Sequence, residues 1–244
     1  EGYLQEARRL CSKYKALLIF DEIQTGFGRT GTLFACEHEG VVPDVLVMAK
    51  SLGGGVVPIG GYITTAQIMK KAFGGMERGL MLTSTFGGNT HCAAAAIAAV
   101  ETIVKENLAG QAAEKGSYFL KKLQALKEKY DIIKEIRGRG LLIGMELSDS
   151  GGLLDFLTAG SVNKLSREYL SSLIAAELLQ KYRILVVFTL NNPNVIRLEP
   201  PLTVSYEQLD QVVDAFDKLF SRHKSFLKMA LQSGKNIISS FLRK

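Results

Sequence analysis

The chain has 244 residues, with 30 Lys and Arg against 24 Asp and Glu, 47% hydrophobic residues and three cysteines. This composition excludes a disordered chain, and the odd cysteine number excludes a fully paired disulfide scaffold. Sparse cysteines are typical of reduced thiols, so we expect a cytoplasmic protein. No apolar run approaches the roughly 20 residues of a membrane span, and the first ten residues lack the apolar core of a signal peptide.

The positive charge is concentrated at the end of the chain. Residues 221–244 hold six basic and no acidic side chains, which accounts for the whole excess of +6. Residues 1–220 are therefore neutral, and we expect no nucleic-acid partner. Apolar residues recur among the lysines of 223–244 at helical spacing, which predicts a basic amphipathic tail. The tail would dock on the protein body, lie on an anionic membrane or lead into a further domain.

The first half of the chain has an α/β pattern. The predicted elements are a helix at 2–14, strands at 16–20, 45–49 and 61–64, and a helix at 91–108. The first two strands are continuous apolar runs, as in strands buried on both faces of a parallel sheet. The first run ends in Asp21 and the second ends in Lys50. In such sheets the chemistry gathers at the carboxyl ends of the strands.

The second half mixes helices with shorter strands. The predicted elements are helices at 110–129 and 166–182, strands at 131–136, 140–147, 184–188 and 195–198, and a last helix from Ser205. Gln208 follows Ser205 by three residues, which is the spacing of a capping box. We predict domains at 1–108 and 109–222, followed by the tail.

Two charged residues at strand ends suggest a chemical site. Alone, Asp21 fits a helix cap or a salt bridge, and Lys50 fits a surface lysine. A lysine at a buried strand end would instead be a nucleophilic amine, because burial disfavours its charged form. Together, an amine and an acid, each followed by a glycine-rich loop, match the needs of pyridoxal phosphate. This cofactor requires an amine for a Schiff base and an acid beside its ring nitrogen.

Four blocks then make the chain recognisable. In order they are LLIFDEIQTGFGRTG, PDVLVMAKSLGGG, TSTFGGN and IRLEPPLT. Together they resemble the class III pyridoxal-phosphate aminotransferases, the group of ornithine, acetylornithine and putrescine aminotransferases. The stretches FACEHEGVVPDVL, GGGVVPIGG and FTLNNPNVIRLEPPLT look most similar to the putrescine (diamine) branch. The resemblance implies a fold type I α/β protein, with part of a large domain containing a parallel-rich sheet and a smaller C-terminal α/β domain.

The resemblance also implies roles for single residues. Asp21 would pair with the pyridinium nitrogen, and Gln24 would bond the phenolic oxygen side of the cofactor. Lys50 would carry the cofactor and later move the proton in the 1,3-shift. Thr85, assisted by Ser84, would bind the cofactor phosphate of the neighbouring subunit in a homodimer with shared active sites.

The last implied role belongs to Arg197, which would bind a substrate carboxylate through its planar fork. The reaction implied is amino transfer from a diamine or ω-amino donor, such as putrescine, to a keto acid such as 2-oxoglutarate. The alternatives are an acetylornithine or ornithine aminotransferase, or a non-catalytic fragment or scaffold subunit. Only the C-terminal portion of the family is covered, which puts activity of this chain alone in question. The histidines and cysteines lack metal-ligand spacing, so we expect no metal.

Overall fold

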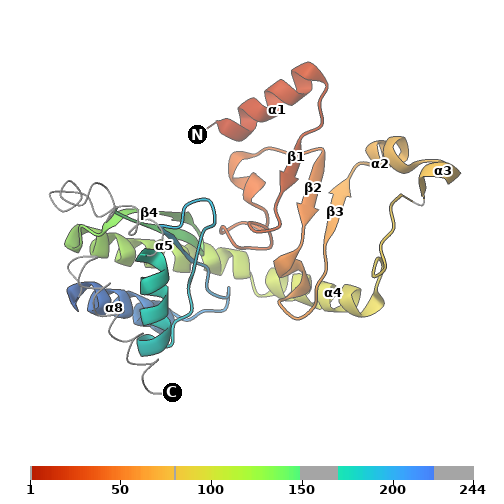
Figure 1. The fold of residues 1–244 in the computed structure, drawn as a ribbon. Helices are drawn as coiled ribbons and strands as arrows, with labels where there is room; N and C mark the ends of the chain where they lie inside the picture. Colours follow the sequence, from red (N-terminus) through yellow and green to blue (C-terminus); the bar gives the residue numbers. More distant parts are fainter. Residues whose placement is uncertain (1, 80, 149–169, 223–244) are drawn as a thin grey trace, which may run out of the picture. The chain divides into compact units, whose positions relative to one another are not determined.

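A computed structural model describes residues 2–79, 81–148 and 170–222 (Figure 1). The chain divides into two compact units, unit 1 (Glu1–Glu114) and unit 2 (Lys115–Lys244). The division falls inside helix α5 (Leu108–Lys129), whose first residue is also where the first predicted domain ends. The predicted tail, 223–244, lies outside the described residues. No helix in the described ranges is both long and apolar enough to span a bilayer.

Unit 1 is built around a three-stranded sheet (Figure 1). Its strands are β1 (Ile19–Asp21), β2 (Val45–Met48) and β3 (Gly61–Thr64). Its helices and 3-10 turns are α1 (Tyr3–Tyr14), η1 (Ala35–Glu39), η2 (Lys50–Gly53), α2 (Ala66–Phe73), α3 (Met76–Gly79) and α4 (Thr90–Lys105). Strands β1 and β2 are parallel, and β3 pairs antiparallel with β2. Strands β2 and β3 follow the predicted positions, whereas β1 begins three residues later than predicted and ends at Asp21. The α/β class is confirmed.

The burial predicted for the first strand is wrong in the described chain. Strand β1 is only three residues long, and Ile19 is 56% exposed. The described residues leave the Ile19 side chain uncovered, and β1 also lies at an edge of the sheet. A continuous apolar run indicates that a strand can be buried on both faces. Whether the strand is buried depends on the residues that pack against those faces.

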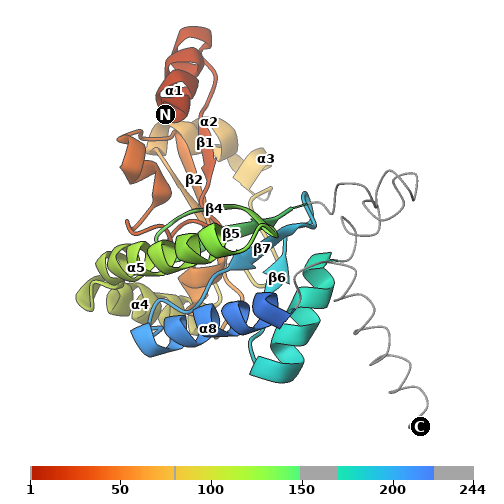
Figure 2. The same ribbon diagram turned by 90° about the vertical axis from the view of Figure 1, so that its left-hand side faces the viewer.

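Unit 2 is a four-stranded antiparallel sheet with helices against it (Figure 2). The strands are β4 (Ile133–Arg139), β5 (Leu142–Leu147), β6 (Val187–Phe188) and β7 (Val195–Leu198), in the order β4-β5-β7-β6. Residues 170–177 are helical and continue into the π-helical segment η3 (Leu178–Tyr182), and α8 (Tyr206–Arg222) is the last described helix. The strand predicted at 184–188 is shorter than expected, because only its last two residues pair with β7.

Helices α5 and α8 lie side by side over the sheet (Figures 1 and 2). Two clusters of contacts join them, one around Asp210 and one around Asp217. Asp210 accepts hydrogen bonds from Tyr118 at 2.8 Å and from Lys122 at 2.6 Å. Asp217 accepts from Lys129 at 2.6 Å. Because the second cluster lies one to two turns further along both helices, the two helices run in the same direction.

The predicted start of the last helix is confirmed at the level of single bonds. The Ser205 backbone N–H donates to Gln208 Oε1 at 3.0 Å, and the Gln208 N–H donates to Ser205 Oγ at 3.3 Å. This reciprocal pair is a capping box, which satisfies two backbone donors that a helix start leaves open. Another close contact needs glycine, since a Cβ on Gly116 would lie 2.1 Å from the Gly140 carbonyl oxygen. Helix α5 can therefore pass the β4–β5 turn only without a side chain at this position.

Candidate active site

Asp21 and Lys50 lie at the carboxyl ends of two neighbouring parallel strands. Asp21 is the last residue of β1 and lies opposite Val47 of β2. Lys50 follows Val47 by three residues and opens η2. Parallel strands end on the same side, so the register places the acid and the lysine at one edge, as the sequence predicted. Asp21 Oδ1 accepts a hydrogen bond from the Ile23 N–H at 3.0 Å.

Lys50 is not buried, contrary to the sequence argument. Its residue is exposed, because the chain leaves β2 after Met48 and turns into η2 at the surface of unit 1. Its backbone has φ 46°, in the left-handed region that a lysine rarely adopts. Its Nζ donates a hydrogen bond to Gln24 Oε1. The structure therefore brings Lys50 together with the predicted cofactor residue Gln24.

The loop that carries Gln24 is organised by Glu22, a residue that the sequence analysis missed. Glu22 is 3% exposed, and its carboxylate accepts hydrogen bonds from the Thr25 hydroxyl and from the N–H groups of Ala35 and Cys36. Gly26 completes the turn, since a Cβ there would lie 2.8 Å from the Glu22 carbonyl oxygen. The available signal was an acid between the apolar strand and the glycine-rich loop. Asp21 and Glu22 both occupy this position in the sequence, and the prediction assigned a role to Asp21 alone.

Ser84 and Thr85 lie elsewhere in unit 1, in the exposed turn before α4. The Gly87 N–H donates to the Ser84 carbonyl at 3.1 Å, and the Asn89 side chain caps α4 by accepting from the Cys92 N–H at 3.0 Å. Within the described ranges, no hydrogen bond joins either hydroxyl to Asp21, Gln24 or Lys50. Both residues are exposed, and their role stays a prediction.

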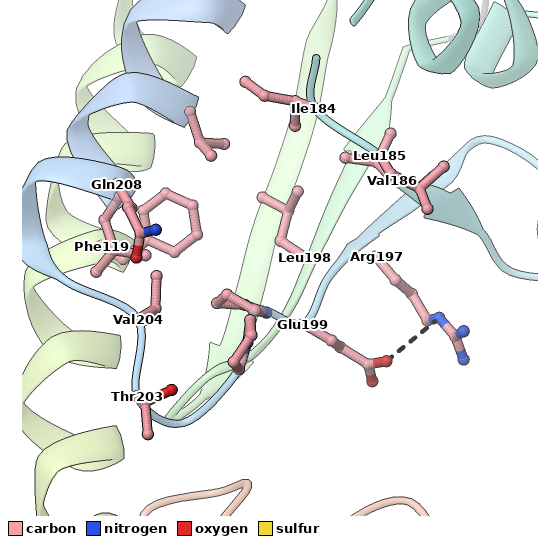
Figure 3. A pocket seen from close by; sticks show the side chains of 14 residues that line it. Phe119, Ile184, Leu185, Val186, Arg197, Leu198, Glu199, Thr203, Val204 and Gln208 are labelled. Carbon is pink, nitrogen blue, oxygen red and sulfur yellow. Dashed lines mark ion pairs between the residues drawn. The ribbon is translucent and has the colours of Figure 1, made fainter. Parts of the chain in front are cut away.

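Arg197 belongs to unit 2, where it lies on β7 between Gly144 of β5 and Val187 of β6. It lines a pocket of about 540 Å³, whose other walls are mainly apolar side chains of 184–186, β7 and α8 (Figure 3). The Arg197 Nε forms an ion pair with Glu199 Oε2 at 3.9 Å, which is too far for a hydrogen bond (Figure 3). Arg197 Nε is buried without a hydrogen-bond partner. Its terminal nitrogens likewise make no hydrogen bond to the residues that the structure describes. This guanidinium can accept a carboxylate ligand.

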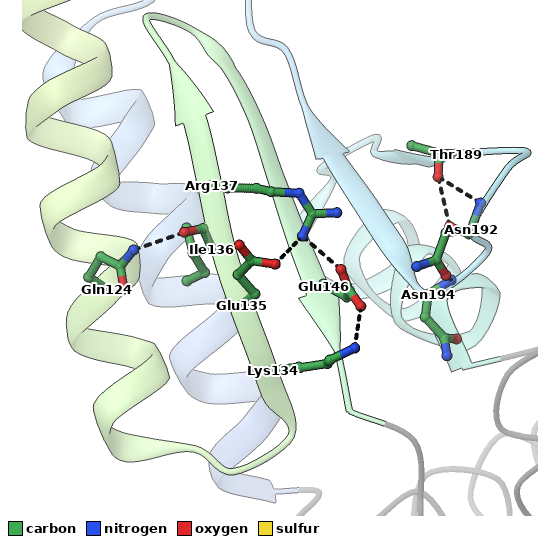
Figure 4. A network of polar contacts seen from close by, with 9 residues as sticks. All are labelled: Gln124, Lys134, Glu135, Ile136, Arg137, Glu146, Thr189, Asn192 and Asn194. Atoms are coloured by element: carbon green, nitrogen blue, oxygen red, sulfur yellow. Dashed lines mark hydrogen bonds and ion pairs between the residues drawn. The ribbon is translucent and has the colours of Figure 1, made fainter. Parts of the chain in front are cut away.

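A second arginine in unit 2 is engaged in the fold instead. Arg137 on β4 pairs with Glu135 at 2.6 Å and with Glu146 at 2.7 Å, and Lys134 also pairs with Glu146 (Figure 4). The hydrogen bonds from Lys134 and Arg137 lower the pKa of Glu146, and the same network raises the pKa of Arg137. These contacts hold the Arg137 guanidinium within the sheet of unit 2.

The chain belongs to the class-III aminotransferases, because the model of that family matches residues 1–220. The acetylornithine aminotransferase of Elizabethkingia anophelis is 34% identical, with a TM-score of 0.73, over 89% of this chain and 49% of that one. The ornithine aminotransferase of Toxoplasma gondii is 35% identical, with a TM-score of 0.74, over 89% of this chain and 45% of that one. A PLP-bound amine transaminase from an uncultivated Pseudomonas species is 31% identical, with a TM-score of 0.76, over 91% and 48%.

The chain thus spans about half the length of these solved relatives. Class-III aminotransferases use pyridoxal 5'-phosphate, and the Toxoplasma structure contains it at partial occupancy. The chemistry of the residues described in unit 1 fits this group. Lys50 offers an amine for its aldehyde, Asp21 an acid for its ring nitrogen and Gln24 an amide for its phenolic oxygen.

Proposed function

We propose that the whole protein is a pyridoxal-phosphate-dependent aminotransferase that moves an amino group from an ω-amino donor to a keto acid such as 2-oxoglutarate. The observation that carries this proposal is the placement of Asp21 and Lys50 at the carboxyl ends of the neighbouring parallel strands β1 and β2, with Lys50 hydrogen-bonded to Gln24. Family membership supports the same chemistry.

In this proposal the bound cofactor supplies an electron sink for the substrate carbon. Asp21 holds the ring nitrogen, and Gln24 orients the phenolic oxygen side. Lys50 Nζ attaches the cofactor and, once free, takes and returns the proton at the substrate carbon as general base and acid. Arg197 binds the substrate carboxylate, which its planar fork matches in a bidentate manner.

Two donors are supported by different observations. The solved relatives named for ornithine and acetylornithine support a donor of that type. The stretches that resemble the diamine branch, including FTLNNPNVIRLEPPLT, support putrescine as the second candidate. Initial rates with each donor at equal concentration decide between them. A preference for putrescine of tenfold or more in kcat/KM would reject the ornithine-type donor.

We also propose a cytoplasmic homodimer in which Ser84 and Thr85 bind the cofactor phosphate of the neighbouring subunit. The exposed hydroxyls and the three free cysteines support this setting. Replacing Thr85 by Ala removes one hydrogen bond to a charged group, so cofactor affinity should fall about tenfold in equilibrium dialysis. Unchanged affinity would argue against the phosphate role.

The direct test of the proposed function is covalent labelling. The protein is incubated with pyridoxal phosphate, reduced with borohydride and digested for mass spectrometry. A pyridoxyl group on Lys50 Nζ is the expected result, and Lys71, an exposed lysine on α2, serves as the internal control for unspecific labelling. Labelling of Lys50 no stronger than that of Lys71 would contradict the proposal.

A further inference from the structure

Glu22 is a buried carboxylate that the proposed chemistry does not use. It is 3% exposed, and none of its partners in the described chain is a cation. The carboxylate accepts three neutral donors: the Thr25 hydroxyl, the Ala35 N–H at 3.0 Å and the Cys36 N–H at 2.8 Å. A buried carboxylate is tolerated only when its oxygens are hydrogen-bonded. These bonds close the loop from residue 22 to residue 36 around one side chain.

The backbone of Glu22 is tied to the strand that leads to Lys50. Its N–H donates to the Val47 carbonyl at 2.9 Å, which continues the β1–β2 pairing one residue past Asp21. Its own carbonyl accepts from the Gly26 N–H at 2.9 Å. Glu22 is therefore fixed to β2 on one side and to its loop on the other.

Gln24 lies between two anchored positions, Glu22 and Thr25. Its Oε1 accepts the hydrogen bond from Lys50 Nζ. We infer that Glu22 is a positioning residue, which holds the loop so that the Gln24 amide meets the Lys50 amine. This inference deepens the proposed function, on which it rests for the role of Lys50.

The hydrogen-bond pattern requires a carboxylate of this length. Oε1 accepts one donor, from Cys36, and Oε2 accepts two, from Thr25 and Ala35. A glutamine would turn an NH₂ group toward one of these donors and leave it unpaired. An aspartate is one methylene shorter and would not reach the same donors without moving the loop. Together with burial, the Glu22 charge also raises the pKa of the Cys36 thiol.

The test is limited acetylation of the purified protein, with labelling of Lys50 measured by mass spectrometry relative to Lys71. An amine held by Gln24 reacts more slowly than a free one. Glu22→Gln and Gln24→Ala should each raise the Lys50 to Lys71 ratio about fivefold, the factor that one net hydrogen bond of ordinary strength represents. Thr25→Val removes a single donor and should give a smaller rise, and it serves where Glu22→Gln does not fold.

Asp44→Asn is the matched control for a purely structural role. Asp44 is also a carboxylate of unit 1, and it accepts from the Leu18 N–H at 2.7 Å and pairs with Arg8 at 2.8 Å. It stands at the other end of β1 and β2, before Val45. Asp44→Asn should therefore lower the melting temperature, as Glu22→Gln does, and leave the Lys50 ratio unchanged.

The double variant Glu22→Gln with Gln24→Ala should label like Gln24→Ala alone, because Glu22 acts through Gln24. Additive effects, an equal rise in Asp44→Asn, or no rise in Glu22→Gln would each overturn the inference. The acetylation needs neither cofactor nor substrate. A protein that passes this test but forms no pyridoxyl adduct on Lys50 would therefore refute the proposed function and leave the role of Glu22 standing.

Discussion

Units 1 and 2 differ in how much of their apolar surface the described residues bury. The largest fully buried side chains among the described residues all belong to unit 2, including Phe119, Phe216 and Phe220. Unit 1 carries Asp21, Gln24 and Lys50, yet the sheet that positions them leaves Ile19 and Ile63 more than half exposed. The residues proposed for catalysis in unit 1 therefore lie in the unit with fewer fully buried side chains among the described residues.

The largest expected effect separates chemistry from stability in unit 1. Lys50→Ala should reduce turnover of the active enzyme by at least about 10²–10⁴-fold, because a general base and the attachment point are both lost. The melting temperature should not fall, since the Lys50 side chain is exposed. Steady-state kinetics and calorimetry measure the two effects, with Lys71→Ala as control. Near-normal turnover of Lys50→Ala would contradict the proposed role of Lys50.

The next prediction concerns the core of unit 2. Phe216 is fully buried and stacks on Phe220 with ring centroids 5.6 Å apart. Phe216→Ala should lower the free energy of unfolding of unit 2 by about 3–5 kcal/mol. The matched control is Phe86→Ala in unit 1, because Phe86 is 80% exposed and its loss should change stability by less than about 0.5 kcal/mol. Denaturant unfolding measures the change in unfolding free energy of both variants. Similar changes in the two variants would contradict the difference in burial between the units.

In the proposed function, Arg197 is the residue of unit 2 that binds the substrate carboxylate. Arg197→Lys keeps the charge but loses the fork, so the KM for the keto acid should rise about tenfold. A diamine carries no carboxylate and should be affected much less, whereas ornithine should be affected like the keto acid. Separate kinetics of the two half-reactions check this. Equal damage with every substrate would make Arg197 a structural residue.

The smallest expected effect is the acid sensitivity of the α5–α8 contact. The hydrogen bonds from Lys122 and Tyr118 lower the pKa of Asp210 below its ordinary value of 3.8, and those from Lys129 and Tyr130 lower the pKa of Asp217. A lowered folded-state pKa stabilises the fold above the unfolded value, and this stability is lost as the pH falls through the folded value. Unfolding midpoints measured from pH 5 downward should therefore fall less steeply in Asp210→Asn than in the unmodified protein.

The sequence predicted those features that depend on neighbours along the chain. The positions of Asp21 at the end of β1 and of Lys50 just after β2 follow from where apolar runs stop, and the Ser205–Gln208 capping box follows from spacing alone. Features that depend on distant contacts were missed. The Glu22 carboxylate organises its loop because the N–H groups of Ala35 and Cys36 donate hydrogen bonds to it. No local sequence pattern indicates these contacts. The exposure of Ile19 depends on what covers that face of the sheet, which an apolar run does not indicate.

The left-handed backbone of Lys50 has a consequence for the history of the family. A non-glycine residue held at positive φ costs about 1 kcal/mol or more, so Lys50 is a position where the fold gives up stability. In a lineage released from selection for the amine, glycine or asparagine at position 50 would relieve that strain and be favoured.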